Sequence, residues 1–146
     1  MQGYWNRPED SEKAFIDGAL RTGDVGYLDE DGYLFLVDRI KDLILCGGYN
    51  VYPRVIEDAL YEHPAVAEAV VIGVPDAYRG QSPKAFVSLR AGMAADEAEL
   101  CAFLKERLSK IEMPSSIELR DHLPKTLIGK LSKKALADEE AARRQA

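Results

Sequence analysis

The sequence predicts a small α+β domain with a central three-stranded sheet flanked by helices. Two apolar runs typical of buried strands, residues 65–75 and 84–89, interleave irregularly with segments that have the apolar spacing of amphipathic helices. The chain has 146 residues, enough for one ordinary domain. Its composition, 47% hydrophobic and 30% charged, is that of a folded globular protein.

The N-terminal part of the chain predicts a β-hairpin. Residues 1–20 are polar and mixed, with no clear periodicity. In YLDEDGYLFLV, Asp31-Gly32 favours a tight primed turn between the strands Tyr27-Leu28 and Tyr33–Val37.

A second hairpin and a helix are expected next. The short strands Leu43–Leu45 and Asn50–Tyr52 are joined through Gly47-Gly48, where glycine adopts turn conformations without the steric cost of a Cβ. Pro53 suits the first turn of a helix, and His63-Pro64 ends it.

The second half of the chain supplies the sheet and two more helices. The predicted strands are residues 65–75, 84–89 and Ile117–Leu119. Residues 76–83 are expected to form a polar loop. Asp96 opens one helix, and Ser132 caps the last helix, which continues into a solvated tail.

Composition excludes several classes of function. A net charge of −6 and a pI near 5.0 argue against nucleic acid as the main partner. No apolar run approaches the roughly 18 residues needed to span a bilayer, and residues 1–13 have no signal-peptide core. Cys46 and Cys101 make no disulfide framework, and two histidines give no metal-ligand spacing, so we expect a cytoplasmic protein without a metal site.

Two charged motifs in the first third are candidate binding elements. In RTGDVG, Asp24 is either a turn former or a carboxylate that accepts both hydroxyls of a ribose. In VDRIKDLI, residues 37–44, the charges indicate either a solvated linker or a hinge, with Arg39 available to the polar groups of a nucleotide. The charges alone do not decide between these interpretations.

A third motif, PKTLIGKLSKKAL, holds four lysines and no acidic residue in an acidic chain. Such charge near a terminus commonly only improves solubility. Lys133 and Lys134 are expected on the last helix, facing water. Lys130, next to Gly129, can instead swing into a neighbouring site and keeps its positive charge at neutral pH.

Taken in order, RTGDVG, DRIKDLILCGGYNVYP, GVPDAYRGQSPKAFV and LPKTLIGK resemble the C-terminal end of acyl-CoA synthetases of the adenylate-forming superfamily. Such enzymes activate a carboxylic acid with Mg-ATP and transfer the acyl group to coenzyme A. The resemblance runs from about residue 3 to residue 136. No phosphate loop resembling TSGTTG occurs in the chain.

The resemblance implies a division of the chain and a role for each motif. Residues 1–38 would be the tail of the large N-terminal adenylating domain, whose remainder is absent, and residues 39–146 the mobile lid. Asp24 and Arg39 would bind ATP and the adenylate, and Lys41 would be the hinge. The implied catalytic lysine is Lys130, and the implied coenzyme A tunnel residues are Gly47, Gly48 and Tyr49.

The resemblance also implies partners and cofactors. The full-length enzyme would use ATP, Mg²⁺ and coenzyme A, with none bound tightly by these 146 residues alone. Its main partner would be the large domain of the same enzyme, and a protein lysine acetyltransferase or deacetylase is a second candidate. The stretch KIEMPSS, residues 110–116, lacks the basic residues that many relatives use for coenzyme A phosphates, so Lys110 and Arg79 are the remaining candidates.

Several functions therefore remain open. The first is the lid of a fatty-acid or aromatic-acid CoA ligase, inactive without its large domain. The second is a regulatory or binding module whose Lys130 is acetylated, which would neutralise its charge. The lid of another adenylate-forming enzyme, such as a luciferase or a peptide-synthetase adenylation domain, and a free-standing domain that lost its chemistry are further alternatives.

Overall fold

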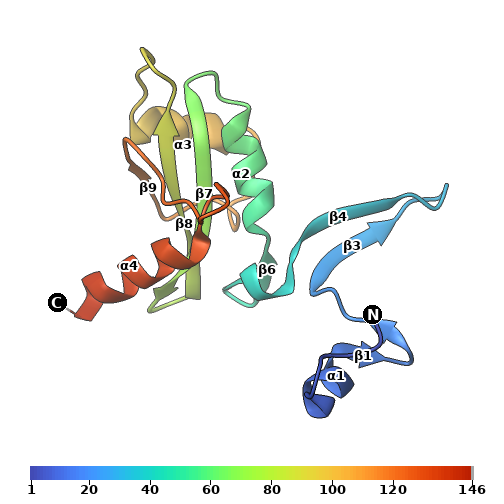
Figure 1. Cartoon of the computed structure of the whole chain (residues 1–146). Coiled ribbons are helices and arrows are strands. Elements are labelled where there is room, and N and C mark those ends of the chain that lie inside the picture. The colour runs from blue at the N-terminus through green and yellow to red at the C-terminus, as the bar shows by residue number, and fades with distance from the viewer. Residues whose placement is uncertain (146) are drawn as a thin grey trace. The chain divides into compact units, whose positions relative to one another are not determined.

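The structure, a computed structural model, describes residues 1–145 and divides into two compact units, Met1–Lys41 and Asp42–Ala146 (Figure 1). Their mixed helices and sheets confirm the α+β class. The division lies three residues after the predicted boundary at residue 38, and the origin of the first unit in a larger domain remains a prediction.

The first unit contains more regular structure than its sequence pattern indicated. It consists of α1 (Pro8–Ala14), β1 (Phe15–Ile16), β2 (Ala19–Leu20), β3 (Asp24–Leu28), β4 (Leu34–Arg39) and the start of the short 3₁₀ helix η1 (Ile40–Asp42). Helix α1 has Pro8 in its first turn, acidic residues after it and Lys13 in its last turn, which suits the helix dipole. It has no buried residue, so no apolar periodicity marks it in the sequence.

The predicted hairpin is present, but its turn is not the expected tight primed turn. Strands β3 and β4 pair antiparallel up to Leu28 and Leu34. The N–H of Asp29 donates to the carbonyl of Tyr33, the N–H of Gly32 donates to the carbonyl of Asp29, and Gly32 has φ +83°. This is a three-residue loop with a glycine bulge. The Asp29 carboxylate also accepts the N–H groups of Asp31 and Tyr33, which favours the longer loop.

The second unit is built on a five-stranded sheet that includes the three predicted strands. Strands β7 (Val66–Asp76) and β8 (Gly80–Leu89) form a long antiparallel hairpin, and β9 (Ser116–Leu119) pairs parallel to β8. The small hairpin of β5 (Ile44–Cys46) and β6 (Tyr49–Val51) joins β8 through Cys46 and Gly80. The polar loop predicted at residues 76–83 is shorter in the structure. The β7–β8 ladder continues to Asp76 and resumes at Gly80, so only residues 77–79 lie outside it.

Both faces of this sheet are covered, which explains the nearly continuous apolar run of β7 (Figure 1). Helices α2 (Pro53–Tyr61) and α3 (Glu97–Lys105) pack on one face, with Ile56, Leu60, Leu100 and Leu104 buried against Val71 and Val87. Helix α4 (Lys133–Gln145) packs on the other, where Leu136 joins Val70, Ile72, Val74, Phe86 and Leu123.

The predicted helix starts are confirmed. Pro53 occupies the first turn of α2. The Asp96 carboxylate accepts the N–H of Glu99 at 2.8 Å, and the Ser132 hydroxyl accepts the N–H of Ala135 at 3.2 Å. None of the helices formed by the described residues combines the length and apolar character required to cross a membrane.

Candidate functional site

Asp24 and Arg39 form a cross-strand pair in the first unit. They are register partners in the β3–β4 ladder, and Arg39 Nε lies 3.3 Å from Asp24 Oδ1. Asp24 begins a strand, and its carboxylate accepts no backbone N–H among the described residues, so the turn-former interpretation is not supported. A carboxylate has about four acceptor positions, which leaves capacity for ligand hydroxyls beside the arginine.

This pair lines a hollow of about 820 Å³ within the first unit. Its other lining residues include Tyr4, Lys13, Arg21, Thr22 and Lys41. The Thr22 hydroxyl accepts the N–H of Asp24 at 3.2 Å, and the carbonyl of Gly23 accepts the N–H of Ile40 at 2.9 Å. These bonds hold the Asp24 segment against the end of β4. The carboxylates of Asp24 and Asp10 therefore line one space together with several cations.

Lys41 is the last residue of the first unit and lies in η1. Its side chain is exposed and lines the same hollow. The sequence left open that residues 37–44 form a solvated linker. Because Arg39 belongs to β4 and Ile44 begins β5, only residues 40–43 can be such a linker.

In the second unit, Gly47-Gly48 forms the two-residue turn between β5 and β6. Both glycines have positive φ, +58° and +84°, as a type I′ turn requires. The turn geometry alone therefore explains why two glycines are adjacent. A Cβ on Gly47 would approach Ile111 Cδ1 at 3.8 Å, an ordinary contact, and one on Gly48 would meet nothing within 4 Å. Tyr49 follows with an exposed side chain.

Two basic residues accompany this glycine turn. The carbonyl of Arg79 accepts the N–H of Gly47 at 2.8 Å, which places the β7–β8 turn beside it. Lys110 immediately precedes Ile111, whose side chain lies nearest to Gly47. The side chain of Arg79 is exposed, and so is that of Lys110. The second unit thus places two residues with exposed basic side chains in the segments next to the glycine turn.

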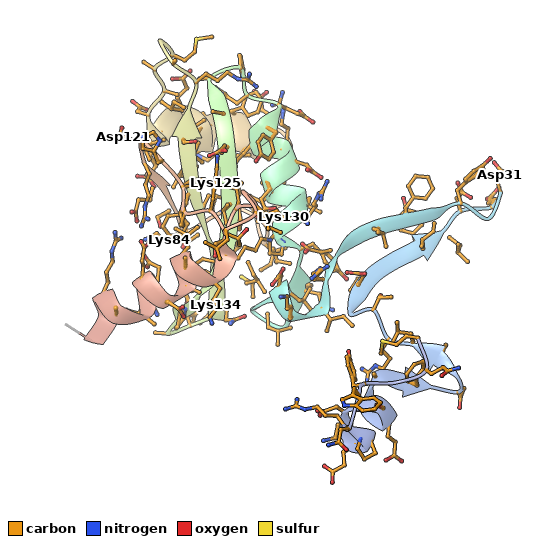
Figure 2. The ribbon with its side chains drawn as sticks, viewed as in Figure 1. Asp31, Lys84, Asp121, Lys125, Lys130 and Lys134 are labelled. Carbon is orange, nitrogen blue, oxygen red and sulfur yellow. The ribbon has the colours of Figure 1, made fainter. Side chains whose placement is uncertain are left out.

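Lys130 lies in another tight turn, on the loop before α4 (Figure 2). The N–H of Thr126 donates to the carbonyl of Lys130 at 2.7 Å, and the N–H of Gly129 donates to the carbonyl of Thr126 at 2.8 Å. Gly129 has φ +81°, so this turn repeats the glycine-bulge geometry of Asp29–Tyr33. The side chains of Leu127, Ile128 and Lys130 are all exposed around it.

The four lysines of PKTLIGKLSKKAL have different surroundings. Lys125 Nζ lies 2.6 Å from Glu68 Oε1, and Lys133 Nζ lies 3.0 Å from Glu57 Oε1. The expectation that Lys133 merely faces water is therefore wrong, because Glu57 is only 13% exposed and holds it. Within residues 1–145, neither Lys130 nor Lys134 has a side-chain hydrogen bond or an ion pair.

Sequence reasoning missed the two glutamates, because nothing local marks them. Glu57 belongs to α2 and Glu68 to β7, both far from Lys130 along the chain. Asp24, Arg39 and Lys41 belong to the first unit, whereas Gly47, Gly48, Tyr49 and Lys130 belong to the second. Among the described residues no group of three or more His, Cys, Asp or Glu side chains could hold a metal ion.

Comparison with known proteins gives a consistent match. A family model described as the AMP-binding enzyme C-terminal domain matches residues 55–130. The long-chain-fatty-acid–CoA ligase of Bacillus subtilis is 52% identical over 140 residues, which cover 96% of this chain and 25% of that protein.

Solved structures also match nearly the whole of this chain. The ATP-bound MatB of Rhodopseudomonas palustris has a TM-score of 0.88 and 39% identity, over 94% of this chain and 28% of that chain. The o-succinylbenzoate CoA synthetase of Bacillus subtilis, in complex with its acyl-adenylate intermediate, has a TM-score of 0.84 and 43% identity, over 93% and 28% of the two chains. The chain therefore spans about a quarter of the length of the relatives it matches.

Proposed function

The chain belongs to the family of AMP-binding enzyme C-terminal domains, and from this membership we propose that it is the mobile lid of an ATP-dependent acid–CoA ligase, preceded by the tail of that enzyme's large domain. In this proposal Lys130 serves the first half-reaction, formation of the acyl-adenylate. The glycine turn at Gly47-Gly48 serves the second, transfer of the acyl group to a thiol.

The observation that carries the proposal is the state of Lys130. It is an exposed ammonium without a partner among the described residues, on a turn closed by backbone hydrogen bonds. Lys125 and Lys133, on either side of it, are engaged in ion pairs. A lysine that only solubilised the chain would need no such ordered turn, whereas a catalytic cation must be both positioned and unpaired.

The chemistry of adenylation explains why one cation matters. Attack of a carboxylate on the α-phosphate of ATP brings two anions together, and pyrophosphate leaves. Charge is spread over the phosphoryl oxygens in the transition state, so positioned positive charge supplies most of the catalysis. The Lys130 ammonium would interact with these oxygens without accepting or losing a proton.

Asp24 and Arg39 would hold the nucleotide. The carboxylate of Asp24 would accept the ribose hydroxyls, and the ion pair with Arg39 at 3.3 Å would orient it. Lys41 would be the hinge, which is supported by the division of the chain immediately after it.

The glycine turn would line the passage of the pantetheine thiol. Gly48 leaves open space, since no atom lies within 4 Å of a Cβ placed on it. Arg79 and Lys110, in the segments next to this turn, would contact the phosphates of coenzyme A. Residues 112–116 have only acidic or neutral side chains and so offer no cation for this role.

A comparison of the two half-reactions tests the role of Lys130. In the full-length enzyme, Lys130→Ala should slow acyl-adenylate formation by two to three orders of magnitude, which is typical for the loss of one preorganised donor. Thiol transfer from a supplied acyl-adenylate should keep its rate. Lys134→Ala is the matched control, because Lys134 is also exposed and unpaired among the described residues, and it should change neither rate.

Three outcomes would contradict the proposal. They are equal loss of both half-reactions in Lys130→Ala, unchanged adenylation in that variant, and acyl-adenylate formation by the 146-residue chain alone, which lacks the large domain.

A second function, as the target of a lysine acetyltransferase, is favoured by the exposure of Lys130 in its protruding turn. Acetylation would remove the charge that adenylation needs. Treatment of the 146-residue chain with an acetyltransferase should then place the acetyl group mainly on Lys130, as read by mass spectrometry. Equal labelling of Lys125, Lys133 and Lys134 would contradict this function.

A further inference from the structure

The loop that carries Lys130 is fixed at both ends by ion pairs to other elements. Before the turn, Lys125 Nζ lies 2.6 Å from Glu68 Oε1 on β7. After the turn, Lys133 Nζ, at the start of α4, lies 3.0 Å from Glu57 Oε1 on α2. Lys130 lies between these two attachments in the sequence and takes part in neither ion pair.

We propose that Glu57 and Glu68 are positioning residues that hold the Lys130 turn in place for adenylation. This inference rests on the catalytic role proposed for Lys130. The two glutamates touch no reacting atom themselves; they act through Lys133 and Lys125, which flank the turn in sequence.

The attachment at Glu57 is the more buried of the two. Its side chain is 13% exposed, and its Oε1 also accepts the N–H of Val71 at 2.9 Å. One carboxylate therefore joins α2, β7 and the first residue of α4. A charge-assisted hydrogen bond in such a half-buried place is stronger and less screened by salt than one on the surface.

The backbone between the attachments transmits their positions to Lys130. Lys125 and Leu131 form an antiparallel bridge, and the N–H of Ser132 donates to the carbonyl of Pro124 at 2.9 Å. Leu131 also packs against the core on the α4 face. With both strands of this small hairpin attached, the turn has little freedom to tilt as a body, so the backbone that carries Lys130 keeps one position relative to the second unit.

The two ion pairs have a second consequence. Lys125 and Lys133 are the nearest cations to Lys130 in the sequence on either side, and their glutamates neutralise both of them. For an anionic ligand that approaches residues 125–133, Lys130 is therefore the lysine whose charge is not neutralised by a glutamate.

Amide hydrogen exchange on the 146-residue chain tests the attachment without any activity. The reporters are the N–H groups of Thr126, Gly129 and Ser132, which close the turn. Their exchange should be roughly tenfold faster when Glu57→Gln and Glu68→Gln are combined, because both ends of the loop are released. Amides of the β7–β8 ladder should be unaffected.

Glu62→Gln is the matched control. It breaks an ion pair of similar length, 2.9 Å to Arg107, near the C-terminal end of α2. In the Glu62→Gln variant, the N–H groups of Thr126, Gly129 and Ser132 should exchange as fast as in the unsubstituted chain. Unchanged exchange of the three turn amides in the double variant would overturn the proposal, and so would acceleration spread evenly over the whole chain.

Half-reaction rates in the full-length enzyme test the consequence for chemistry. Glu68→Gln should lower kcat for adenylate formation about tenfold with little change in KM for ATP, and leave thiol transfer from a supplied acyl-adenylate unchanged. Exchange of the two charges, Glu68→Lys with Lys125→Glu, should restore the rate. Loss of both half-reactions, or no recovery in the exchanged pair, would contradict a positioning role.

Lys130→Ala separates this inference from the function on which it rests. If Lys130→Ala abolishes adenylation while Glu68→Gln leaves kcat intact, the lysine is catalytic and the positioning proposal is wrong. If Lys130→Ala leaves adenylation intact, the proposed function itself fails, whatever the exchange experiment shows.

Discussion

Two glycine turns of the second unit place different demands on their residues. Gly129 lies in the bulge position of the Lys130 turn, where φ +81° sets the backbone. Gly47 and Gly48 form a type I′ turn, for which Asn-Gly is as suitable as Gly-Gly. The first glycine of that turn can therefore be replaced without loss of the fold, and this separates its structural role from its proposed role in thiol passage.

Gly47→Asn should keep the fold and impair only the second half-reaction. Asparagine tolerates the left-handed conformation, and its Cβ would make an ordinary contact with Ile111, so the free energy of unfolding should change by less than about 0.5 kcal/mol. The added side chain would obstruct the proposed thiol passage. Thiol transfer in the full-length enzyme should fall about tenfold, with adenylation unchanged.

Gly47→Ala serves as the control for backbone strain in this turn, since alanine adopts positive φ at greater cost. It should lower the free energy of unfolding in urea by about 1 kcal/mol. Undiminished thiol transfer in Gly47→Asn would show that the glycines serve the turn alone.

Ion pairs fasten α4 to the sheet. Lys84 Nζ on β8 lies 2.9 Å from Glu118 Oε2 on β9 and 2.7 Å from Glu140 Oε1 on α4. Arg120 Nη1 lies 2.7 Å from Glu139 Oε2. Glu118 is at the centre, because three cations donate to it: Lys84, Arg120 and Arg143. Removing one charged side chain from such a half-buried network leaves the charges of its partners unpaired, which is costly. The network therefore stabilises the packing of α4, the helix that follows the Lys130 turn.

Glu118→Gln should weaken this docking in a pH-dependent way. Burial opposes ionisation of Glu118, but hydrogen bonds from Arg143, Lys84 and Arg120 outweigh it and lower the pKa of that carboxyl from 4.5 to about 2. A lowered folded-state pKa stabilises the fold above about pH 4.5, and this contribution is lost as the pH falls toward 2. At pH 7 the substitution should cost on the order of 2 kcal/mol of the free energy of unfolding.

Urea unfolding of the 146-residue chain at pH 7 and pH 3 measures this difference. The gap between the unsubstituted chain and Glu118→Gln should be smaller at pH 3, where Glu118 in the unfolded chain is protonated. Glu106→Gln, at a residue 82% exposed and 3.7 Å from its arginine, should have little effect at either pH. A gap of equal size at both pH values would contradict the role given to the ionised carboxylate.

Elements with local signals were predictable from the sequence, and elements fixed by distant contacts were not. Pro53, Asp96 and Ser132 marked helix starts through side-chain chemistry that acts within a few residues. The pairing of Cys46 with Gly80, which adds the β5–β6 hairpin to the sheet, has no such local mark. The same holds for Glu57 and Glu68. Their lysine partners are far away in the sequence, so these ion pairs can be identified only from the folded structure.

At the scale of the whole molecule, the two units differ in how they are stabilised. No residue among 1–41 is buried, whereas the second unit contains two hydrophobic clusters around its sheet. The β3–β4 hairpin exposes Tyr27, Leu28, Phe35 and Leu36, among other apolar side chains. A hairpin that leaves so much apolar surface uncovered is typical of a segment that packs against further protein. The match to about a quarter of each relative agrees with this.

The two units also divide the candidate site. The pair Asp24 and Arg39, proposed to bind the nucleotide, lies in the first unit. The proposed catalytic lysine lies in the second, and Lys41 is at the division. In the proposed enzyme the lid can therefore bring Lys130 to the adenylating centre for one half-reaction and the glycine turn for the other. Each half-reaction should depend on its own part of the lid.

The central claim is that the positive charge of Lys130 accelerates adenylate formation, and reversible acetylation of this one residue tests it most directly. The measurement is the single-turnover rate of acyl-adenylate formation by the full-length enzyme with acetyl-lysine installed at position 130, before and after enzymatic removal of the acetyl group. The account predicts a rate lowered by two to three orders of magnitude, restored when the acetyl group is removed, and constant thiol transfer throughout. An adenylation rate that is the same with and without the acetyl group would contradict it.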